Sequence, residues 1–264
     1  MRFVLYVRNG EGYSELRAEL DPAMTVLDAL ESLRAAAEGG AKPAVARVPH
    51  YRHSCHHGSC GTCSAVVNGL ESLMCLTRLG ELAAARPRKP GAAPEPPEIA
   101  ADGAVIVRID PIRRGALVGG VAARPDEALR AIPEWLGYLR PAEAIDKAEL
   151  EGDPTRQATG EVLSGRAPER VRFEACIECG LCSSSCPVSV PFMGPAALAA
   201  MNRGRERGEA RAEELLDSAA APDGAAACER HLACSRVCPQ AVYPGKHIQL
   251  LKNALASLAA KMKA

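Results

Sequence analysis

The residues with the clearest capacity for chemistry are eleven cysteines, which fall into three groups at 55–75, 176–186 and 228–238. An odd number of cysteines cannot form a complete set of intramolecular disulfides. The first residues lack the pattern of a secretory signal, and no stretch approaches about 18 uninterrupted apolar residues, so we expect a cytosolic protein. Because clustered thiols in a reducing compartment more often bind metal than form disulfides, the cysteines predict metal centres.

The first group has the spacing C-x4-C-x2-C, followed after eleven intervening residues by a fourth cysteine: Cys55, Cys60, Cys63 and Cys75. This is the spacing of plant-type [2Fe–2S] clusters, in which four thiolates converge on two irons. Zinc also accepts four thiolates, but zinc sites usually pair two C-x2-C knuckles, whereas this loop holds three cysteines within nine residues. The spacing therefore favours a [2Fe–2S] cluster over a structural zinc ion.

Two other residue types in this loop bear on the cluster. Gly58 and Gly61 would let the backbone wrap tightly and direct N–H groups at the sulfurs. His56 and His57 lie in the same loop, and two histidines bind one of the irons in Rieske clusters. Since four suitably spaced cysteines are already present, solvent-exposed loop histidines are the simpler interpretation.

The second group follows the run C-x2-C-x2-C-x3-C-P of two-cluster bacterial ferredoxins, in which the fourth cysteine ligates the other cluster. The third group, CERHLACSRVCP, follows the same template with one thiol missing, because His231 stands where the template has cysteine. If the exchange of the last cysteine applies to both runs, one [4Fe–4S] cluster is bound by Cys176, Cys179, Cys182 and Cys238.

Three cysteines then remain for the last cluster: Cys186, Cys228 and Cys234. Three thiolates suit a [3Fe–4S] cluster, a cube lacking one iron, whose empty corner would face residue 231. In a second interpretation the cluster is [4Fe–4S] and the His231 imidazole binds the fourth iron, since imidazole is a competent iron ligand. In a third, His231 only donates a hydrogen bond near the cluster or is unrelated to the metal. All eleven cysteines are accounted for.

The elements that must position the first loop follow from the N-terminal pattern. Residues 2–8 alternate apolar and polar, and the turn after them predicts a hairpin with residues 14–20. Thr25 is the predicted N-cap of a helix whose apolar residues recur at helical spacing: Val26, Leu27, Ala29, Leu30 and Leu33. With further strands predicted at 64–69 and 104–110, these elements predict a β-grasp ferredoxin domain.

Beyond about residue 125 the pattern becomes helical, with helices predicted over 126–139, 194–218 and 246–263. The sequence thus predicts an α+β fold. A β-grasp [2Fe–2S] domain is predicted over residues 1–115. It includes a Pro-rich loop at 86–102, whose composition indicates an extended linker or covering loop. An all-helical ferredoxin-type domain with two cubane-type clusters spans residues 116–264.

Composition narrows the classes of partner. Lys and Arg together number 32, as do Asp and Glu, so the formal net charge of zero argues against a nucleic-acid-binding protein. Only 3% of the residues are aromatic, so the core must be built from Ala, Leu and Val or supplemented by bound groups. There is no G-x-G-x-x-G or other nucleotide-binding signature, so a flavin is not expected in this chain.

With three such clusters in this order, the chain resembles, over nearly its whole length, the iron–sulfur subunit of succinate dehydrogenase and fumarate reductase, the complex II family. The segments that carry the resemblance are YRHSCHHGSCGTC, CIECGLCSSSCP, CSRVCP, FMGPAAL, VYPGKHI and VIVRID. The family implies the same architecture, a β-grasp [2Fe–2S] domain followed by a helical domain with a [4Fe–4S] and a [3Fe–4S] cluster.

The resemblance also implies a function, as the electron-transfer subunit of a succinate:quinone oxidoreductase or quinol:fumarate reductase. In such enzymes single electrons pass through the three clusters between quinone and FAD. The FAD is held by a flavoprotein subunit, where succinate and fumarate interconvert, so no catalytic residue is expected in this chain. Membrane anchor subunits, in some cases haem-bearing, would hold the chain peripherally at the cytoplasmic face of the inner membrane.

One stretch departs from the family pattern. Members commonly place tryptophan shortly after the C-P pair, beside the quinone, whereas this chain has PVSVPF there and its only tryptophan is Trp135. Quinone contacts would then come from Pro187, Val188, Phe192 and His231. The missing tryptophan motivates an alternative function, in which the same ferredoxin module serves a soluble thiol- or heterodisulfide-linked reductase complex without quinone chemistry.

Overall fold

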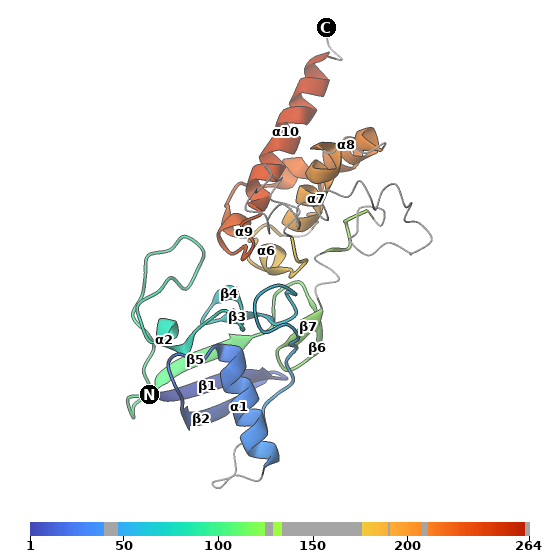
Figure 1. Cartoon of the computed structure of the whole chain (residues 1–264). Helices are drawn as coiled ribbons and strands as arrows, with labels where there is room; N and C mark the ends of the chain where they lie inside the picture. The colour runs from blue at the N-terminus through green and yellow to red at the C-terminus, as the bar shows by residue number, and fades with distance from the viewer. Residues whose placement is uncertain (40–46, 125–128, 134–175, 190, 207–210, 262–264) are drawn as a thin grey trace, which may run out of the picture.

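The structure, a computed structural model, describes residues 1–39, 47–124, 129–133, 176–189, 191–206 and 211–261. A mixed β-sheet with one covering helix forms the N-terminal part, and a group of helices lies against one end of it (Figure 1). The predicted α+β class is therefore confirmed. Of the helix predicted over 126–139, only residues 129–133 are described, and the rest lies outside the described residues.

The N-terminal sheet has five strands in the order β2-β1-β5-β3-β4. Its strands are β1 (Arg2–Asn9), β2 (Gly12–Glu19), β3 (Ser64–Val67), β4 (Leu70–Leu73) and β5 (Val105–Asp110). β1 pairs parallel with β5, and the other pairs are antiparallel. The predicted hairpin and the strands predicted at 64–69 and 104–110 are present. β4 was not predicted; it follows a two-residue turn at Asn68 and Gly69, whose positive φ angles of 48° and 84° suit a tight hairpin.

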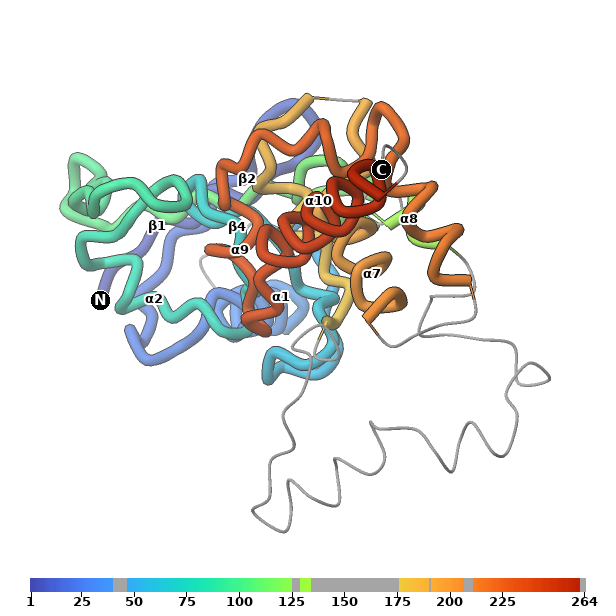
Figure 2. Tube along the Cα trace, turned by 90° about the horizontal axis from the view of Figure 1, so that it is seen from above, coloured from blue at the N-terminus to red at the C-terminus, as the bar shows by residue number. Residues whose placement is uncertain are grey.

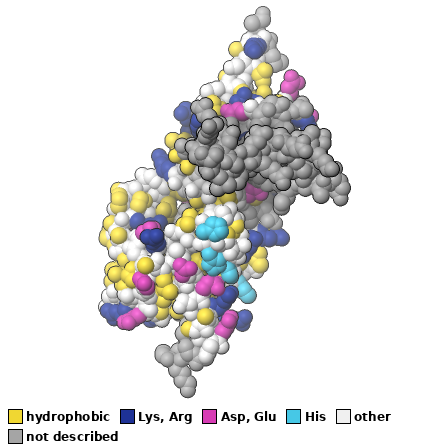
Figure 3. Space-filling model, viewed as in Figure 1, with side chains coloured by type: hydrophobic (Ala, Val, Ile, Leu, Met, Phe, Trp, Pro, Cys, Tyr) yellow, Lys and Arg dark blue, Asp and Glu magenta, His cyan; other side chains and the backbone are white. Residues whose placement is uncertain are grey.

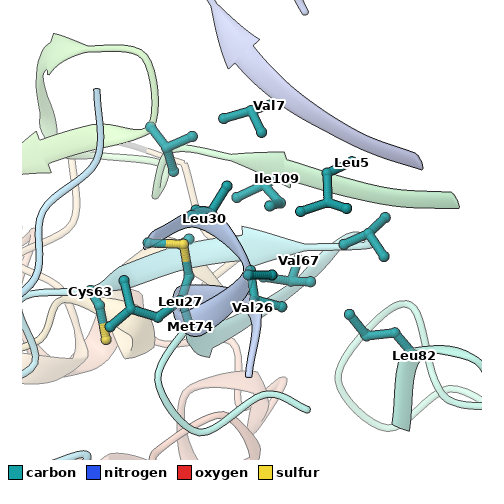
Figure 4. Packing of buried hydrophobic residues seen from close by; sticks show 14 of the residues in the cluster. Leu5, Val7, Val26, Leu27, Leu30, Cys63, Val67, Met74, Leu82 and Ile109 are labelled. Atoms are coloured by element: carbon teal, nitrogen blue, oxygen red, sulfur yellow. The ribbon is translucent and has the colours of Figure 1, made fainter. Parts of the chain in front are cut away.

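The helix α1 (Val26–Glu38) begins where the sequence predicts it. Thr25 caps the helix: its Oγ1 accepts from the Asp28 N–H at 3.1 Å, and Asp28 Oδ2 accepts from the Thr25 N–H at 3.0 Å. The five apolar residues predicted to share a face are the buried ones. Leu27 and Leu30 pack there against residues of the sheet such as Leu5 (Figure 4). Together α1 and the sheet form the core that supports the first cysteine loop.

Two short elements complete the N-terminal part. The helix α2 (Leu79–Leu82) follows the last cysteine of the first group. Residues 116–124, which the sequence analysis places in the all-helical domain, instead form a hairpin of β6 (Ala116–Gly119) and β7 (Ala122–Arg124). The description of that domain as all-helical is therefore wrong at its start. The physical reason is that Val121 and Ala123 bury their side chains in the core of the N-terminal sheet.

The later part is built from α6 (Leu181–Ser184), α7 (Pro195–Glu206), α8 (Ala212–Ala220), the 3₁₀ helix η4 (Ala225–Ala227), α9 (Ala233–Arg236) and α10 (Pro244–Lys261). α7 lies within the one helix predicted over 194–218, whereas α8 begins within that range and ends two residues beyond it. α10 overlaps most of the helix predicted over 246–263. Figure 2 shows α10 lying alongside α7, and these helices surround a second apolar core. None of the helices in the described ranges is long and apolar enough to cross a membrane.

Candidate metal centres

The four cysteines of the first group lie at the end of the sheet. Cys63 immediately precedes β3 and Cys75 follows shortly after β4, so the hairpin of these strands fixes two of the thiols. A hydrogen bond from the Met74 N–H to the Cys63 carbonyl, at 3.1 Å, joins the two segments. Cys63 and Cys75 are buried, whereas Cys55 and Cys60 are partly exposed. The site therefore has a protein side and a solvent side.

The backbone of this loop turns through left-handed conformations at Gly58 and Gly61, with φ of +83° and +69°. The Ser59 N–H donates to Cys55 Sγ at 3.3 Å. Hydrogen bonding from Ser59 lowers the pKa of Cys55 to about 5, and burial raises the pKa of Cys75 to about 12. The loop thus already stabilises the Cys55 thiolate. The buried Cys75 thiol, in contrast, needs a positively charged partner in order to ionise.

The histidines of the loop lie on the solvent side. His56 and His57 are exposed, and Figure 3 shows histidine side chains gathered at the surface of the N-terminal part. Their ring nitrogens are engaged locally: His53 Nδ1 lies 2.9 Å from His56 Nε2, and His57 Nε2 lies 3.0 Å from Ser59 Oγ. These contacts agree with the interpretation of His56 and His57 as surface residues.

The second candidate site is a cavity between α6, α7 and the start of α10. All four cysteines expected to share a cluster line it: Cys176, Cys179, Cys182 and Cys238. The last of these comes from a different cysteine run than the other three, and the Val242 N–H donates to its Sγ at 3.4 Å. Burial raises the pKa of Cys176 to about 11 and of Cys179 to about 12, and that of Cys182 is also well raised. These thiols are neutral unless a metal compensates the charge.

The third candidate site is a smaller cavity lined by Cys186, Cys228 and Cys234. The four residues suggested for the quinone side line the same cavity: Pro187, Val188, Phe192 and His231. The His231 side chain is 47% exposed, and its Nε2 lies 2.9 Å from Glu229 Oε2. His231 therefore lies at the rim of this cavity with one ring nitrogen bonded to a carboxylate.

The first two sites are in direct contact. A Cβ added to Gly61 would lie 2.7 Å from Cys179 Cβ, so only glycine lets the first loop approach the second thiol group this closely. Gln240, next to the C-P pair of the third run, lines the second cavity and donates from Nε2 to the Gly58 carbonyl at 3.0 Å. The sequence analysis did not identify Gln240, because nothing in its local pattern marks a contact made 182 residues away.

Gly61→Ala is expected to lower the stability of the protein. An alanine at this φ costs about 1–2 kcal/mol, and its Cβ would also overlap the Cys179 side chain and the Ile177 carbonyl. Gly10→Ala is the matched control, because Gly10 has a similar φ of +60° and no atom within 4 Å of an added Cβ. Thermal unfolding should show a larger loss for Gly61→Ala than for Gly10→Ala; equal losses would contradict the close contact.

The donor set fits iron–sulfur clusters. Apart from His231, every candidate ligand is a thiol, and soft thiolates select Fe–S clusters, zinc or Cu(I). Apolar residues such as Ala196, Ala199 and Val242 complete the second cavity, and backbone N–H groups reach two of the sulfurs. Within the described ranges, no three or more His, Cys, Asp or Glu side chains are grouped so as to hold a single metal ion.

Comparisons with known proteins agree with these features. Residues 4–117 match the family model of the 2Fe-2S iron-sulfur cluster binding domain, and residues 172–242 that of the 4Fe-4S dicluster domain. Both descriptions are those of iron–sulfur proteins.

Curated relatives define the family more closely. The chain is 30% identical over 218 residues to the fumarate reductase iron-sulfur subunit of Mycobacterium tuberculosis, covering 80% of this chain and 76% of that protein. It is 29% identical over 209 residues to the subunit of the same name from Haemophilus influenzae, covering 75% and 72%. The chain belongs to the family of fumarate reductase and succinate dehydrogenase iron–sulfur subunits, as its resemblance predicted.

A solved structure shares the fold. A chain of the Mycobacterium smegmatis Sdh1 complex in the apo form superposes with a TM-score of 0.63 at 21% identity, covering 97% of this chain and 96% of that chain. The likeness extends over both the sheet and the helical part, so the two parts occur together in one known fold.

Proposed function

We propose that this chain is the electron-transfer subunit of a succinate:quinone oxidoreductase or quinol:fumarate reductase. The observation that carries the proposal is the placement of all eleven cysteines at three neighbouring sites, with the second thiol group in contact with the first loop. When bound, iron–sulfur clusters accept and donate one electron at a time, which suits a relay between a two-electron flavin reaction and a quinone.

The proposed ligand sets follow the three sites. A [2Fe–2S] cluster is assigned to Cys55, Cys60, Cys63 and Cys75, and a [4Fe–4S] cluster to Cys176, Cys179, Cys182 and Cys238. A [3Fe–4S] cluster is assigned to Cys186, Cys228 and Cys234. The shared cavities support the exchange of Cys186 and Cys238 between the two runs. The bond between His231 and Glu229 favours a histidine that borders the third cluster over one that ligates it.

The chain's own residues would bind and tune these groups. The cysteine thiols must lose their protons to bind iron, so cluster assembly releases protons. Deprotonation costs most at Cys179 and Cys182, because burial raises the pKa of both thiols. The Ser59 and Val242 N–H groups stabilise charge on the sulfurs they contact. Burial of the second site by α7 and α10 excludes water, which is one of the factors that set a cluster's potential.

The proposed partners are a flavoprotein subunit that carries FAD and one or more membrane anchor subunits, which hold this chain at the cytoplasmic face of the inner membrane. Quinone would bind beside the third site. Support for that placement comes from a second, more open groove that shares Cys228 and Cys234 with the third cavity. It is bordered by Leu232 and Tyr243, which are 46% and 41% exposed. Large exposed apolar side chains of this kind occur at interaction sites.

Purification of the native complex tests the proposal. We expect a flavoprotein partner, iron with acid-labile sulfide, and cluster signals in low-temperature EPR that respond to succinate. Inhibition by quinone analogues is expected as well. A complex with clusters but with neither succinate response nor quinone-analogue inhibition would instead support the thiol- or heterodisulfide-linked reductase. Zinc without iron would contradict both functions.

A further inference from the structure

Glu71 is a buried carboxylate that lines neither of the two cysteine cavities, so the cluster sites do not explain its burial. It lies on β4, its side chain has no exposed surface, and its Oε2 has no hydrogen-bond partner among the described residues. Burying a carboxylate is costly unless it is paired and hydrogen-bonded. The contacts of its other oxygen therefore indicate what the residue does.

Glu71 Oε1 joins three segments that are far apart in the sequence. It accepts from Arg113 Nη2 at 2.7 Å and from Ser184 Oγ at 3.1 Å. The Ser184 hydroxyl in turn accepts from the Arg113 N–H at 2.9 Å, so its donor and one acceptor position are both used. We call Glu71, Arg113 and Ser184 the interdomain junction, because it links β4 and the segment after β5 to α6.

The element held by the junction carries cluster ligands. α6 has only four residues and no side-chain N-cap, and a helix this short is not stable by itself. Cys182 lies within it and Cys186 lies two residues after Ser184. The position of α6 therefore depends on tertiary contacts. Leu181 supplies an apolar contact by inserting into the core of the N-terminal sheet, and Ser184 supplies a polar contact through its hydrogen bond to Glu71.

We infer that the interdomain junction positions α6, and with it Cys182 and Cys186, against the sheet that carries the first thiol site. Glu71 and Ser184 are thus positioning residues for electron transfer between the first and second clusters. A carboxylate can accept both hydrogen bonds on one oxygen while packed between the two parts. The inference rests on the proposed function for the clusters, although the junction itself is a feature of the protein alone.

The test compares Ser184→Ala with Ser183→Ala in the native complex. Ser183 is the matched control, because it is equally buried on α6 and its Oγ has no hydrogen-bond partner among the described residues. The first measurement is hydrogen exchange of the amides of residues 183–186. The second is the magnetic interaction between the reduced first and second clusters in EPR, which depends on their separation.

Ser184→Ala removes both the hydrogen bond that α6 donates to Glu71 and the one that it accepts from the Arg113 N–H. Because α6 is then held less firmly, we expect the amides of residues 183–186 to exchange about tenfold faster than in the native chain. The magnetic interaction should also change, whereas Ser183→Ala should match the native chain in both measurements. Glu71→Leu should reproduce Ser184→Ala, and Glu71→Gln should retain native behaviour because its amide oxygen can accept both bonds. These two variants decide the question if Ser184→Ala does not fold.

Native behaviour of both Ser184→Ala and Glu71→Leu would overturn the inference. So would a Glu71→Gln variant that behaves like Glu71→Leu, since the hydrogen bonds would then not be the cause. If the native complex itself contains no clusters, the proposed function fails, while hydrogen exchange still tests the junction.

Discussion

Cys238→Ala is expected to abolish the second cluster and leave the third. Although Cys238 lies only four residues after Cys234 in the sequence, it lines the cavity of Cys176, Cys179 and Cys182. Changes to residues that merely support metal ligands already cost about 10–100-fold in affinity or activity, so loss of a ligand should lower electron transfer by more than about 100-fold. EPR of the reduced complex should lose the [4Fe–4S] signal, and the oxidised-state signal of the third cluster should persist.

Cys186→Ala is the reciprocal experiment and serves as the control. Cys186 closes the run that supplies the second cluster, yet it lines the third cavity with Cys228 and Cys234. Its replacement should therefore abolish the oxidised-state signal of the third cluster and retain the [4Fe–4S] signal. If each variant instead loses the cluster formed by its neighbours in the sequence, the exchange between the two runs is wrong.

Features set by local pattern could be predicted from the sequence. The start of α1 follows from Thr25 and Asp28, which cap the helix within four residues, and its buried face follows from the helical spacing of the apolar residues. The lining of each of the two cavities by cysteines from both runs could be predicted for a different reason. The spacing of a ferredoxin run already reflects the three-dimensional exchange of its last cysteine, so a one-dimensional pattern carried long-range information.

Features set by contacts between distant segments could not be predicted. In the sequence, LESL around Glu71 is too short and too polar to suggest the strand β4, which forms because the Asn68–Gly69 turn folds it onto β3. The hairpin at 116–124 is rich in glycine and alanine and resembles a loop; it is stabilised by burial of Val121 and Ala123. The bond between Glu71 and Ser184 spans 113 residues and has no local signature.

His231→Cys is expected to convert the third cluster to [4Fe–4S]. The substitution completes the ferredoxin run C-x2-C-x2-C-x3-C-P, and residue 231 lies at the rim of the cavity that Cys186, Cys228 and Cys234 line. The oxidised-state EPR signal of a [3Fe–4S] cluster should disappear, and iron analysis should find one more iron per chain. Because a cluster lacking one iron is typically the higher-potential member, the conversion should lower the potential and slow electron delivery to quinone.

His231→Ala separates the interpretations that the sequence left open. With His231 bonded to Glu229 rather than to iron, the alanine variant should keep the [3Fe–4S] signal and lose no iron. A native complex that is EPR-silent when oxidised, and whose third cluster is lost or altered in His231→Ala, would show that the imidazole is a ligand. The cysteine variant would then add no iron. The two substitutions at one position therefore determine whether the missing thiol is the feature that makes the third cluster a three-iron centre.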